Sequence, residues 1–196
     1  MLQLNHVTIT KGNRDILRDC TFQFEEGKIY VILGDQDDCI TLFNCMCKEK
    51  KTDDGEIVTW DGMSIYNASD DSLLPHLLTG EEYLSNLTRI SGSAVSMEEA
   101  ARDAGLSHEE LKDLIENHTE LTRAKIRLAA MPIIDPYIMT FGAPFPEKDH
   151  LCGLLKRYGE EKVLLTATSD PNEAVMLVEN AGAVMVCLQE GYLKLA

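Results

Sequence analysis

The first third of the chain has the pattern of hydrophobic and polar positions that is typical of β-strands. Residues 2–10 alternate apolar and polar side chains, and β-branched and aromatic residues cluster again at 20–24. Residues 28–33 form a short apolar run, which indicates a strand buried on both faces. Gly34 ends this run, and residues 40–47 then predict a helix. This order of strand, glycine, short loop and helix is typical of α/β proteins, whose ligands bind at the carboxyl ends of the strands.

The rest of the chain alternates between strand and helix patterns. Two strands are expected at residues 56–60 and 63–66, joined by a hairpin turn at Asp61 and Gly62. Three hydroxyl residues are each followed three positions later by a glutamate, which is the spacing of a capping box at a helix start: Thr79 with Glu82, Ser96 with Glu99, and Ser107 with Glu110. Residues 72–118 are therefore expected to form a helical lobe. Further helices are expected at 120–131, 149–158 and 173–179, and further strands at 137–141, 163–166, 183–188 and 192–195.

The composition is strongly acidic. The 196 residues include 33 aspartates and glutamates against 18 lysines and arginines, which gives a formal charge of −15 and a pI of about 4.6. Such a charge repels polyanions, so we expect no nucleic-acid partner. No apolar run reaches the roughly 18 residues of a membrane span, and residues 1–11 lack the features of a signal peptide. We expect a cytoplasmic protein without direct membrane insertion, whose six cysteines are free thiols.

Several short segments, in a fixed order, carry a resemblance to a known family. They lie at residues 4–8, 12–17, 24–30, 55–57, 61–62, 74–82, 135–136 and 170–174. Their order and spacing resemble the ATP-binding subunit of ABC transporters along the whole chain. The resemblance implies an ABC-type P-loop NTPase fold, with a RecA-like α/β core, an antiparallel β layer and an inserted helical lobe. We expect a single domain over residues 1–196, with the core at 1–71 and 119–196 and the lobe at 72–118.

The family's phosphate loop falls on a segment that is rich in aspartate. The family pattern is Gly-x-x-x-x-Gly-Lys-Ser/Thr, because glycine lets backbone N–H groups approach phosphate, lysine neutralises it and the hydroxyl binds magnesium. The matching window is Gly34, Asp35, Gln36, Asp37, Asp38, Cys39, Ile40 and Thr41. Cys39 replaces the second glycine and Ile40 replaces the lysine. Each pair of like charges about 4 Å apart costs on the order of 4 kcal/mol at an effective dielectric near 20. We therefore expect no ATP binding in the family's mode.

The aspartates of this loop have two further interpretations. Asp37 and Asp38 would complement the positive end of a helix dipole, which is worth roughly 0.3–1 kcal/mol each. Alternatively, Asp35 could join them in a site for a hard cation, since such cations favour clustered carboxylates. The segment lacks the glycine and the distal glutamate of a calcium loop, so we expect no metal there.

The resemblance also implies roles for other positions, where the required chemistry is missing. The adenine-stacking aromatic falls on Lys11, which has no ring. The metal-binding aspartate and the catalytic glutamate fall on Gly142 and Ala143, and the switch histidine falls on Ser169. The glutamine of the metal-sensing loop falls near Ser69. The signature Leu-Ser-Gly-Gly-Gln, which contacts a partner's γ-phosphate, falls on His118, Thr119, Glu120, Leu121 and Thr122.

These losses lead to three hypotheses of function. Phosphoryl transfer depends almost wholly on positioned cations and dipoles, so the leading hypothesis is a catalytically degenerate ABC ATPase-like protein with no catalytic residues and no cofactor. It would regulate or assemble with an ABC permease, at the inner face of a membrane, or with another ABC ATPase subunit. Because its loop and signature would both spoil the family's ATP sandwich, we expect a monomer or a dimer through another surface. The alternative is a divergent but functional ATP-binding subunit with ATP and Mg as cofactors, and the third is a cation-responsive acidic scaffold.

Overall fold

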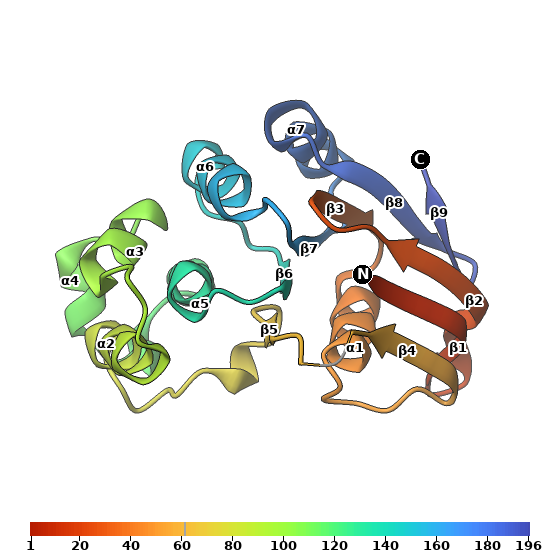
Figure 1. Ribbon diagram of the computed structural model, residues 1–196, viewed down its shortest axis with the longest axis horizontal. Coiled ribbons are helices and arrows are strands. Elements are labelled where there is room, and N and C mark those ends of the chain that lie inside the picture. The colour runs from red at the N-terminus through yellow and green to blue at the C-terminus, as the bar shows by residue number, and fades with distance from the viewer. Residues whose placement is uncertain (61) are drawn as a thin grey trace.

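The computed structural model describes residues 1–60 and 62–196, whose strands form two sheets (Figure 1). The smaller sheet consists of β1 (Leu2–Lys11), β2 (Arg14–Phe24) and β4 (Asp54–Thr59), and it is antiparallel in the order β2-β1-β4. The larger sheet consists of β3 (Lys28–Leu33), β5 (Ile65–Asn67), β6 (Ile138–Gly142), β7 (Val163–Thr168), β8 (Val184–Gln189) and β9 (Tyr192–Leu195). Its order is β5-β6-β7-β3-β8-β9, and its pairs are parallel except for that of β8 with β9.

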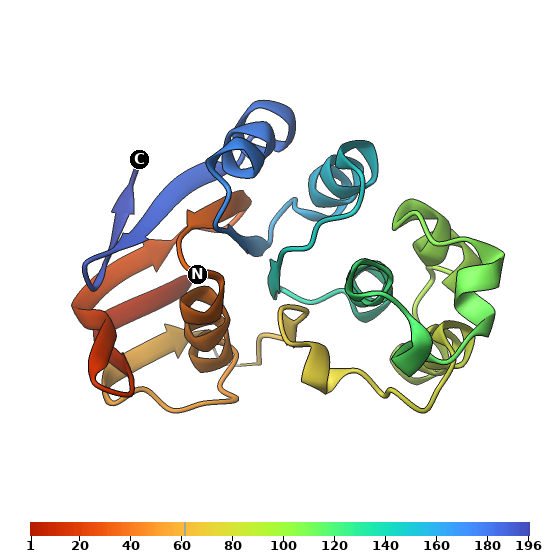
Figure 2. The ribbon, with the colours of Figure 1, turned by 180° about the vertical axis from the view of Figure 1, so that it is seen from behind.

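Helices lie around the larger sheet. They are α1 (Gln36–Met46), α2 (Gly80–Ser91), α3 (Met97–Asp103), α4 (His108–Lys112), α5 (Glu120–Ile134), α6 (Lys148–Tyr158) and α7 (Pro171–Ala181). Figures 1 and 2 show α2, α3 and α4 at the end of the molecule away from the antiparallel sheet, with α5 between them and β6. Within the described ranges, no helix has both the length and the apolar character that crossing a membrane requires.

The hairpin expected at residues 56–66 is wrong. β4 pairs with β1, placing Ile57 opposite Leu4, whereas β5 pairs in parallel with β6, placing Tyr66 beside Met139. The two segments therefore belong to different sheets, because each finds its pairing partner far away in the sequence. The turn assigned to Asp61 and Gly62 involves Asp61, which lies outside the described residues.

Several element boundaries also differ from the expected ones. β2 begins at Arg14 instead of residue 20. α1 begins at Gln36 instead of Ile40, because the side chain of Asp35 caps the earlier turn. α5 continues through Pro132 to Ile134, and the residue that caps its C-terminus, Asp135, has a left-handed φ of 52°. A proline inside a helix removes one backbone hydrogen bond, and here the helix continues for two residues beyond it, to Ile134.

The capping-box prediction is confirmed at two of its three positions. The hydroxyl of Thr79 accepts from the backbone N–H of Glu82, and the carboxylate of Glu82 accepts from the N–H of Thr79; Ser107 and Glu110 exchange the same two bonds. Ser96 also caps its helix, but the carboxylate of its partner Glu99 accepts from Arg157 of α6 instead. A tertiary contact thus replaces half of one local motif.

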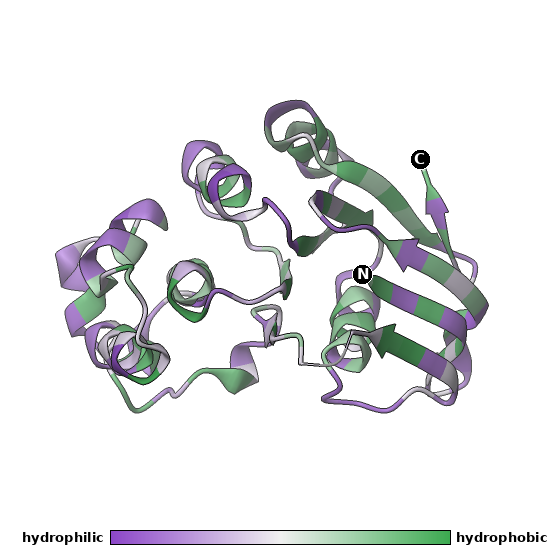
Figure 3. Cartoon of the chain, in the orientation of Figure 1, coloured by the Kyte–Doolittle hydropathy of each residue, from purple (hydrophilic) through white to green (hydrophobic). Residues whose placement is uncertain are grey.

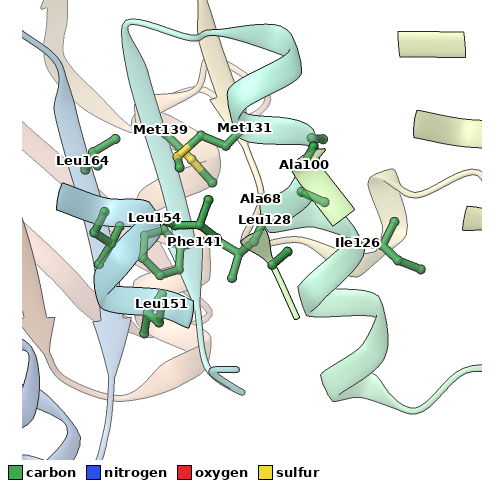
Figure 4. Packing of buried hydrophobic residues seen from close by; sticks show 14 of the residues in the cluster. Ala68, Ala100, Ile126, Leu128, Met131, Met139, Phe141, Leu151, Leu154 and Leu164 are labelled. Atoms are coloured by element: carbon green, nitrogen blue, oxygen red, sulfur yellow. The ribbon is translucent and has the colours of Figure 1, made fainter. Parts of the chain in front are cut away.

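Two hydrophobic clusters lie on opposite faces of the larger sheet. One joins the sheet to α1 and the antiparallel sheet, and the other joins it to the remaining helices. Figure 4 shows Leu151 and Leu154 of α6 beside Phe141 of β6 in the second cluster. That cluster also contains Leu84 of α2 and Ala100 of α3, so the helices of residues 72–118 share one core with the sheet. Figure 3 shows hydrophobic residues concentrated on the strands, whereas the outer helices α3 and α4 are mostly hydrophilic.

Candidate functional site

The candidate site is the loop between β3 and α1, at the carboxyl end of the central strand. The N–H of Gly34 donates to the carbonyl of Thr168 at the end of β7, with N and O 3.1 Å apart. A Cβ at Gly34 would lie 3.0 Å from the Cβ of Leu188 and 3.3 Å from the Sγ of Cys39. Glycine is therefore favoured here by the close approach of β8 and α1, whose side chains would have to shift to admit a Cβ.

The hydroxyl and carboxyl groups of the loop are used to start α1. Oδ1 of Asp35 accepts from the backbone N–H of Asp38, with the two atoms 3.1 Å apart. Oγ1 of Thr41 donates to the carbonyl of Asp37 at 2.8 Å. Asp37 and Asp38 lie in the first helical turn, which confirms the interpretation that they complement the helix N-terminus.

The structure also brings two cations from the antiparallel sheet to this loop. Nζ of Lys11 lies 3.1 Å from Oδ2 of Asp37. The guanidinium of Arg14 donates to both carboxylate oxygens of Asp38, at 2.6 and 2.7 Å, in the bidentate geometry that arginine favours. The Asp38 side chain is only 7% exposed, whereas that of Arg14 is 62% exposed. The loop is thus closed by ion pairs, and the cations reduce the repulsion among its carboxylates that the sequence predicts.

These contacts bear on the cation site considered for Asp35, Asp37 and Asp38. Each of the three carboxylates has a partner already: a backbone N–H, a lysine and an arginine respectively. Across the part of the chain that the structure describes, no group of three or more histidines, cysteines, aspartates and glutamates is placed to hold a metal ion. A cation would have to compete with the existing partners of these aspartates.

A cavity of about 600 Å³ opens beside the loop, between the β1–β2 turn and the β8–β9 turn. This volume is in the range of small-molecule sites. Its charged lining consists of Arg14, Arg18, Asp15, Asp35, Asp38 and Glu190. Because carboxylates outnumber cations in this lining, binding of a polyanion is less favourable in this cavity than in a typical phosphate site.

The end of β6 meets the loop through a side-chain contact. Nε2 of Gln36 donates to the carbonyl of Ala143 at 2.9 Å, so the loop and the strand end are neighbours, as the resemblance implies. Neither Gly142 nor Ala143 supplies a carboxylate at this point. At the end of β7, Ser169 is exposed, and the hydroxyl of Thr168 donates to the carboxylate of Glu173.

The remaining expected site residues lie elsewhere. Ser69 is buried and hydrogen-bonded to Asn67. Thr119 caps α5 through the N–H of Thr122, whose hydroxyl donates to Glu110 at 3.3 Å. Among the described residues, no hydrogen bond or ion pair joins residues 118–122 to residues 34–41. His118 precedes the N-cap of α5, and Glu120 and Leu121 lie in the first turn of this helix.

Some partners in this region were not found from the sequence. Arg14 lies in the family-like segment 12–17 and Glu173 in the helix expected at 173–179, but the sequence predicts no role at the loop for either. Neither falls on a position to which the resemblance gives a phosphate-handling role, and Arg14 is 24 positions from the aspartate that it contacts. No local sequence signal identifies a contact of this kind.

Two thiols of α1, the buried Cys39 at its start and the half-buried Cys47 at its end, are expected to make the protein's stability depend on pH. Burial, followed by the nearby Asp38, raises the pKa of Cys39 to about 12, and burial raises the pKa of Cys47 to about 12. An unfolded thiol ionises near pH 9, so above that pH the unfolded state binds fewer protons than the folded state. The free energy of unfolding is therefore expected to fall from about pH 9 to about pH 12, by at most about 1.4 kcal/mol per pH unit for each thiol.

Urea denaturation at pH 7.5, 9 and 10 measures this dependence. Cys39→Ala is expected to show a shallower loss than the wild-type chain, because one thiol no longer contributes. An identical pH dependence in the two proteins would contradict the assignment. The tyrosines that also titrate at high pH are the same in both, so the difference between the proteins isolates Cys39.

Comparison with known proteins shows which solved structures have a similar fold. No family model matches the sequence, and no curated protein is detected as a relative. The bacterial ABC transporter cassette MJ0796, in a dimeric structure, matches with a TM-score of 0.79 and 20% identity over 99% of this chain and 97% of that chain. The same cassette, dimeric and bound to ADP and Pi, matches with a TM-score of 0.78 at the same identity and coverage.

Two other solved structures agree. A Pyrococcus furiosus protein described as an ABC transporter ATP-binding protein has a TM-score of 0.75 and 16% identity over 96% of this chain and 98% of its own. A bacterial Atm1-family ABC exporter with ATP bound has a TM-score of 0.75 and 13% identity over 98% of this chain and 37% of its own. At these identities the likeness concerns the fold. The chain has the fold of ABC ATP-binding cassettes, and the expected α/β, P-loop NTPase architecture is confirmed.

Proposed function

We propose that this chain is a non-hydrolysing cassette-like protein that acts by binding a partner. The observation that carries the proposal is the pairing of Asp38 with Arg14 and of Asp37 with Lys11, which occupies the loop where the cassette fold would hold phosphate. A nucleotide would have to displace the carboxylates from these cations, and the displaced carboxylates would then repel it.

The groups needed for phosphoryl transfer are also missing. Such transfer is driven by positioned cations and dipoles that stabilise charge on the phosphoryl oxygens. Ile40 stands at the expected lysine position, Gly142 and Ala143 at the expected carboxylates, and Ser169 at the expected histidine. No step of hydrolysis can be assigned to these side chains, so we propose that the chain needs neither ATP nor Mg.

The partner that we propose is an ABC permease or another ABC ATPase subunit. The cassette MJ0796 is described as dimeric, but residues 118–122 of this chain start α5 and offer no signature glycines to a second subunit. An ATP sandwich would therefore lack contributions from this side, and we propose a monomer or a dimer through another surface. A permease would place the chain at the cytoplasmic face of a membrane, and its charge of −15 disfavours nucleic acid.

Calorimetric titration with Mg-ATP, combined with a phosphate-release assay, tests the proposal. We expect neither a binding heat at micromolar concentrations nor release of phosphate. Thr41→Ala serves as the loop variant, and Ser85→Ala, which removes an exposed hydroxyl of α2, serves as its control. Micromolar binding or turnover that Thr41→Ala abolishes and Ser85→Ala retains would contradict the proposal, because the activity would then belong to this loop and not to a contaminant.

The alternative is a divergent but functional ATP-binding subunit. The observation in its favour is that Lys11 and Arg14 lie at the loop and bring two cations, although Ile40 replaces the usual lysine. In that case ATP and Mg would be cofactors, and Thr41 would have to give up its bond to the carbonyl of Asp37. The same titration decides between the two functions.

A further inference from the structure

A cluster of charged side chains fixes the segment that leads from β5 towards α2. Arg127 of α5 is only 4% exposed; its Nε donates to the carbonyl of Ala68 at 2.8 Å, and its Nη1 donates to the carboxylate of Asp71. Arg123, one turn earlier in α5, donates from Nε to the other oxygen of Asp71 at 2.7 Å and from Nη1 to the carbonyl of His118 at 2.5 Å. We call Asp71, Arg123 and Arg127 the Asp71 clamp.

A second group of contacts holds the same segment from the side of the larger sheet. The amide of Asn67 donates to Oδ1 of Asn44 in α1 at 2.8 Å and to Oε2 of Glu49 at 2.6 Å, and its oxygen accepts from Thr140 of β6 at 2.9 Å. The backbone N–H of Ala68 donates to the carbonyl of Thr140 at 2.7 Å. The segment is therefore anchored to β6 and α1 on one side and to α5 on the other.

Contacts beyond the clamp extend this anchoring to α3 and α4. The N–H of Ile115 donates to the carbonyl of Leu78 at 2.9 Å, next to a bridge between Thr79 and Leu114 that pins the chain before α2 to the chain after α4. On the far side, Arg157 of α6 donates to Glu99 at 2.8 Å and to Asp103 at 2.6 Å, both in α3. Figure 2 shows α5 between α3 and α4 on one side and β6 on the other, so α5 can couple the clamp contacts to both.

We infer that the Asp71 clamp fixes α5 to the segment after β5, and that the helices of residues 72–118, which pack on α5, are thereby held to the larger sheet and move with it as one body without any ligand. The physical reason is the burial of Arg127. If the segment swung away, the guanidinium would stay in the core without its carboxylate, and removing one partner of a buried ion pair is strongly unfavourable. The inference does not depend on the proposed function, since it would hold for a chain that hydrolyses ATP as well.

Amide hydrogen exchange of the intact wild-type chain, followed by mass spectrometry of its peptides, tests the lock. Peptides covering α2 and residues 113–118, whose amides are hydrogen-bonded, are expected to exchange within about 10-fold of the rate for peptides from β6 and β7, because the two regions open together. Exchange faster than this limit in the wild-type chain would overturn the inference, since the helices would then open independently of the sheet.

The variant Asp71→Asn, which keeps the shape of the side chain and removes its charge, tests the clamp itself. α2 and residues 113–118 are expected to exchange on the order of 100-fold faster, while β1 and β2 are unchanged. Glu98→Gln removes the same charge from an exposed position of α3 and is expected to change neither region.

Three results would overturn the role of the clamp. They are no acceleration in Asp71→Asn, the same acceleration in both variants, and an acceleration spread evenly over the whole chain. If Asp71→Asn does not fold, Arg123→Gln replaces it, because this change removes only the more exposed of the two arginines and leaves Arg127 paired with Asp71. Because Arg127 keeps its partner in this variant, exchange in the same peptides is expected to rise less, by about 10-fold, and the three contrary results apply unchanged.

Discussion

Replacing Gly55 with alanine is expected to lower the free energy of unfolding by more than about 3 kcal/mol. Gly55 has a φ of +73°, and a Cβ there would lie 2.2 Å from the carbonyl oxygen of His6 and 2.6 Å from that of Asn5. These atoms belong to β1, which is the central strand of the antiparallel sheet and is paired on both sides. The backbone cannot yield at this point without breaking the pairing of Asn5 with Glu56.

Gly12→Ala is the matched control for this prediction. Gly12 also has a positive φ, of +66°, but nothing lies within 4 Å of its added Cβ. The cost there is expected to be only the roughly 1–2 kcal/mol of a left-handed backbone with a side chain. Urea denaturation followed by circular dichroism measures both variants. Equal losses in the two would show that backbone conformation, and not the clash with β1, dominates at Gly55.

Arg127→Leu is expected to cost about 3–5 kcal/mol of stability, because it leaves the carboxylate of Asp71 and the carbonyl of Ala68 without this donor inside the fold. Arg127→Lys is expected to recover only part of this loss. A lysine keeps the charge, but a single ammonium cannot donate along the two directions that Nε and Nη1 of the guanidinium serve. Thermal and urea denaturation measure the series.

The comparison is completed by a control and a double-mutant cycle. Arg89→Leu removes an exposed guanidinium of α2 that contacts only Asn86 among the described hydrogen bonds, and it is expected to change stability by less than about 0.5 kcal/mol. Combining Arg127→Leu with Asp71→Asn is expected to be non-additive by about 0.5–3 kcal/mol, since the two side chains interact directly. Additive losses would contradict a direct interaction between them.

Local patterns account for much of the fold. The apolar run at residues 28–33 became the central strand β3, and the hydroxyl–glutamate pairs marked the starts of α2, α3 and α4. These features depend on residues within one turn or one strand of each other, so the sequence displays them directly. The hairpin expected at residues 56–66 failed because the pairing partners of β4 and β5 lie far away in the chain.

Some features of the candidate site could likewise be predicted from the sequence, and others could not. Its position after β3 follows from the sequence, and the family resemblance implies a lysine, two carboxylates and a histidine at positions where the sequence has Ile40, Gly142, Ala143 and Ser169. The place of Asp37 and Asp38 at a helix start also followed from the sequence, whereas the pairing of these aspartates with distant cations did not. In the folded chain, Asp35 caps α1, and Asp37 and Asp38 meet Lys11 and Arg14. The division into a core and a lobe remains a prediction, since the helices of residues 72–118 share one hydrophobic cluster with the sheet.

The amino-acid sequence alone was sufficient for the class of fold, for the helix starts, and for the chemical identity of the loop after β3. It could not supply the ion pairs that close this loop and hold the helices to the sheet. Those pairs join residues 24, 26 and 56 positions apart. The sequence does not indicate which distant charged residue a given side chain will contact. The choice is made by packing, because strand pairing and burial of the core bring particular side chains within hydrogen-bonding distance and exclude others.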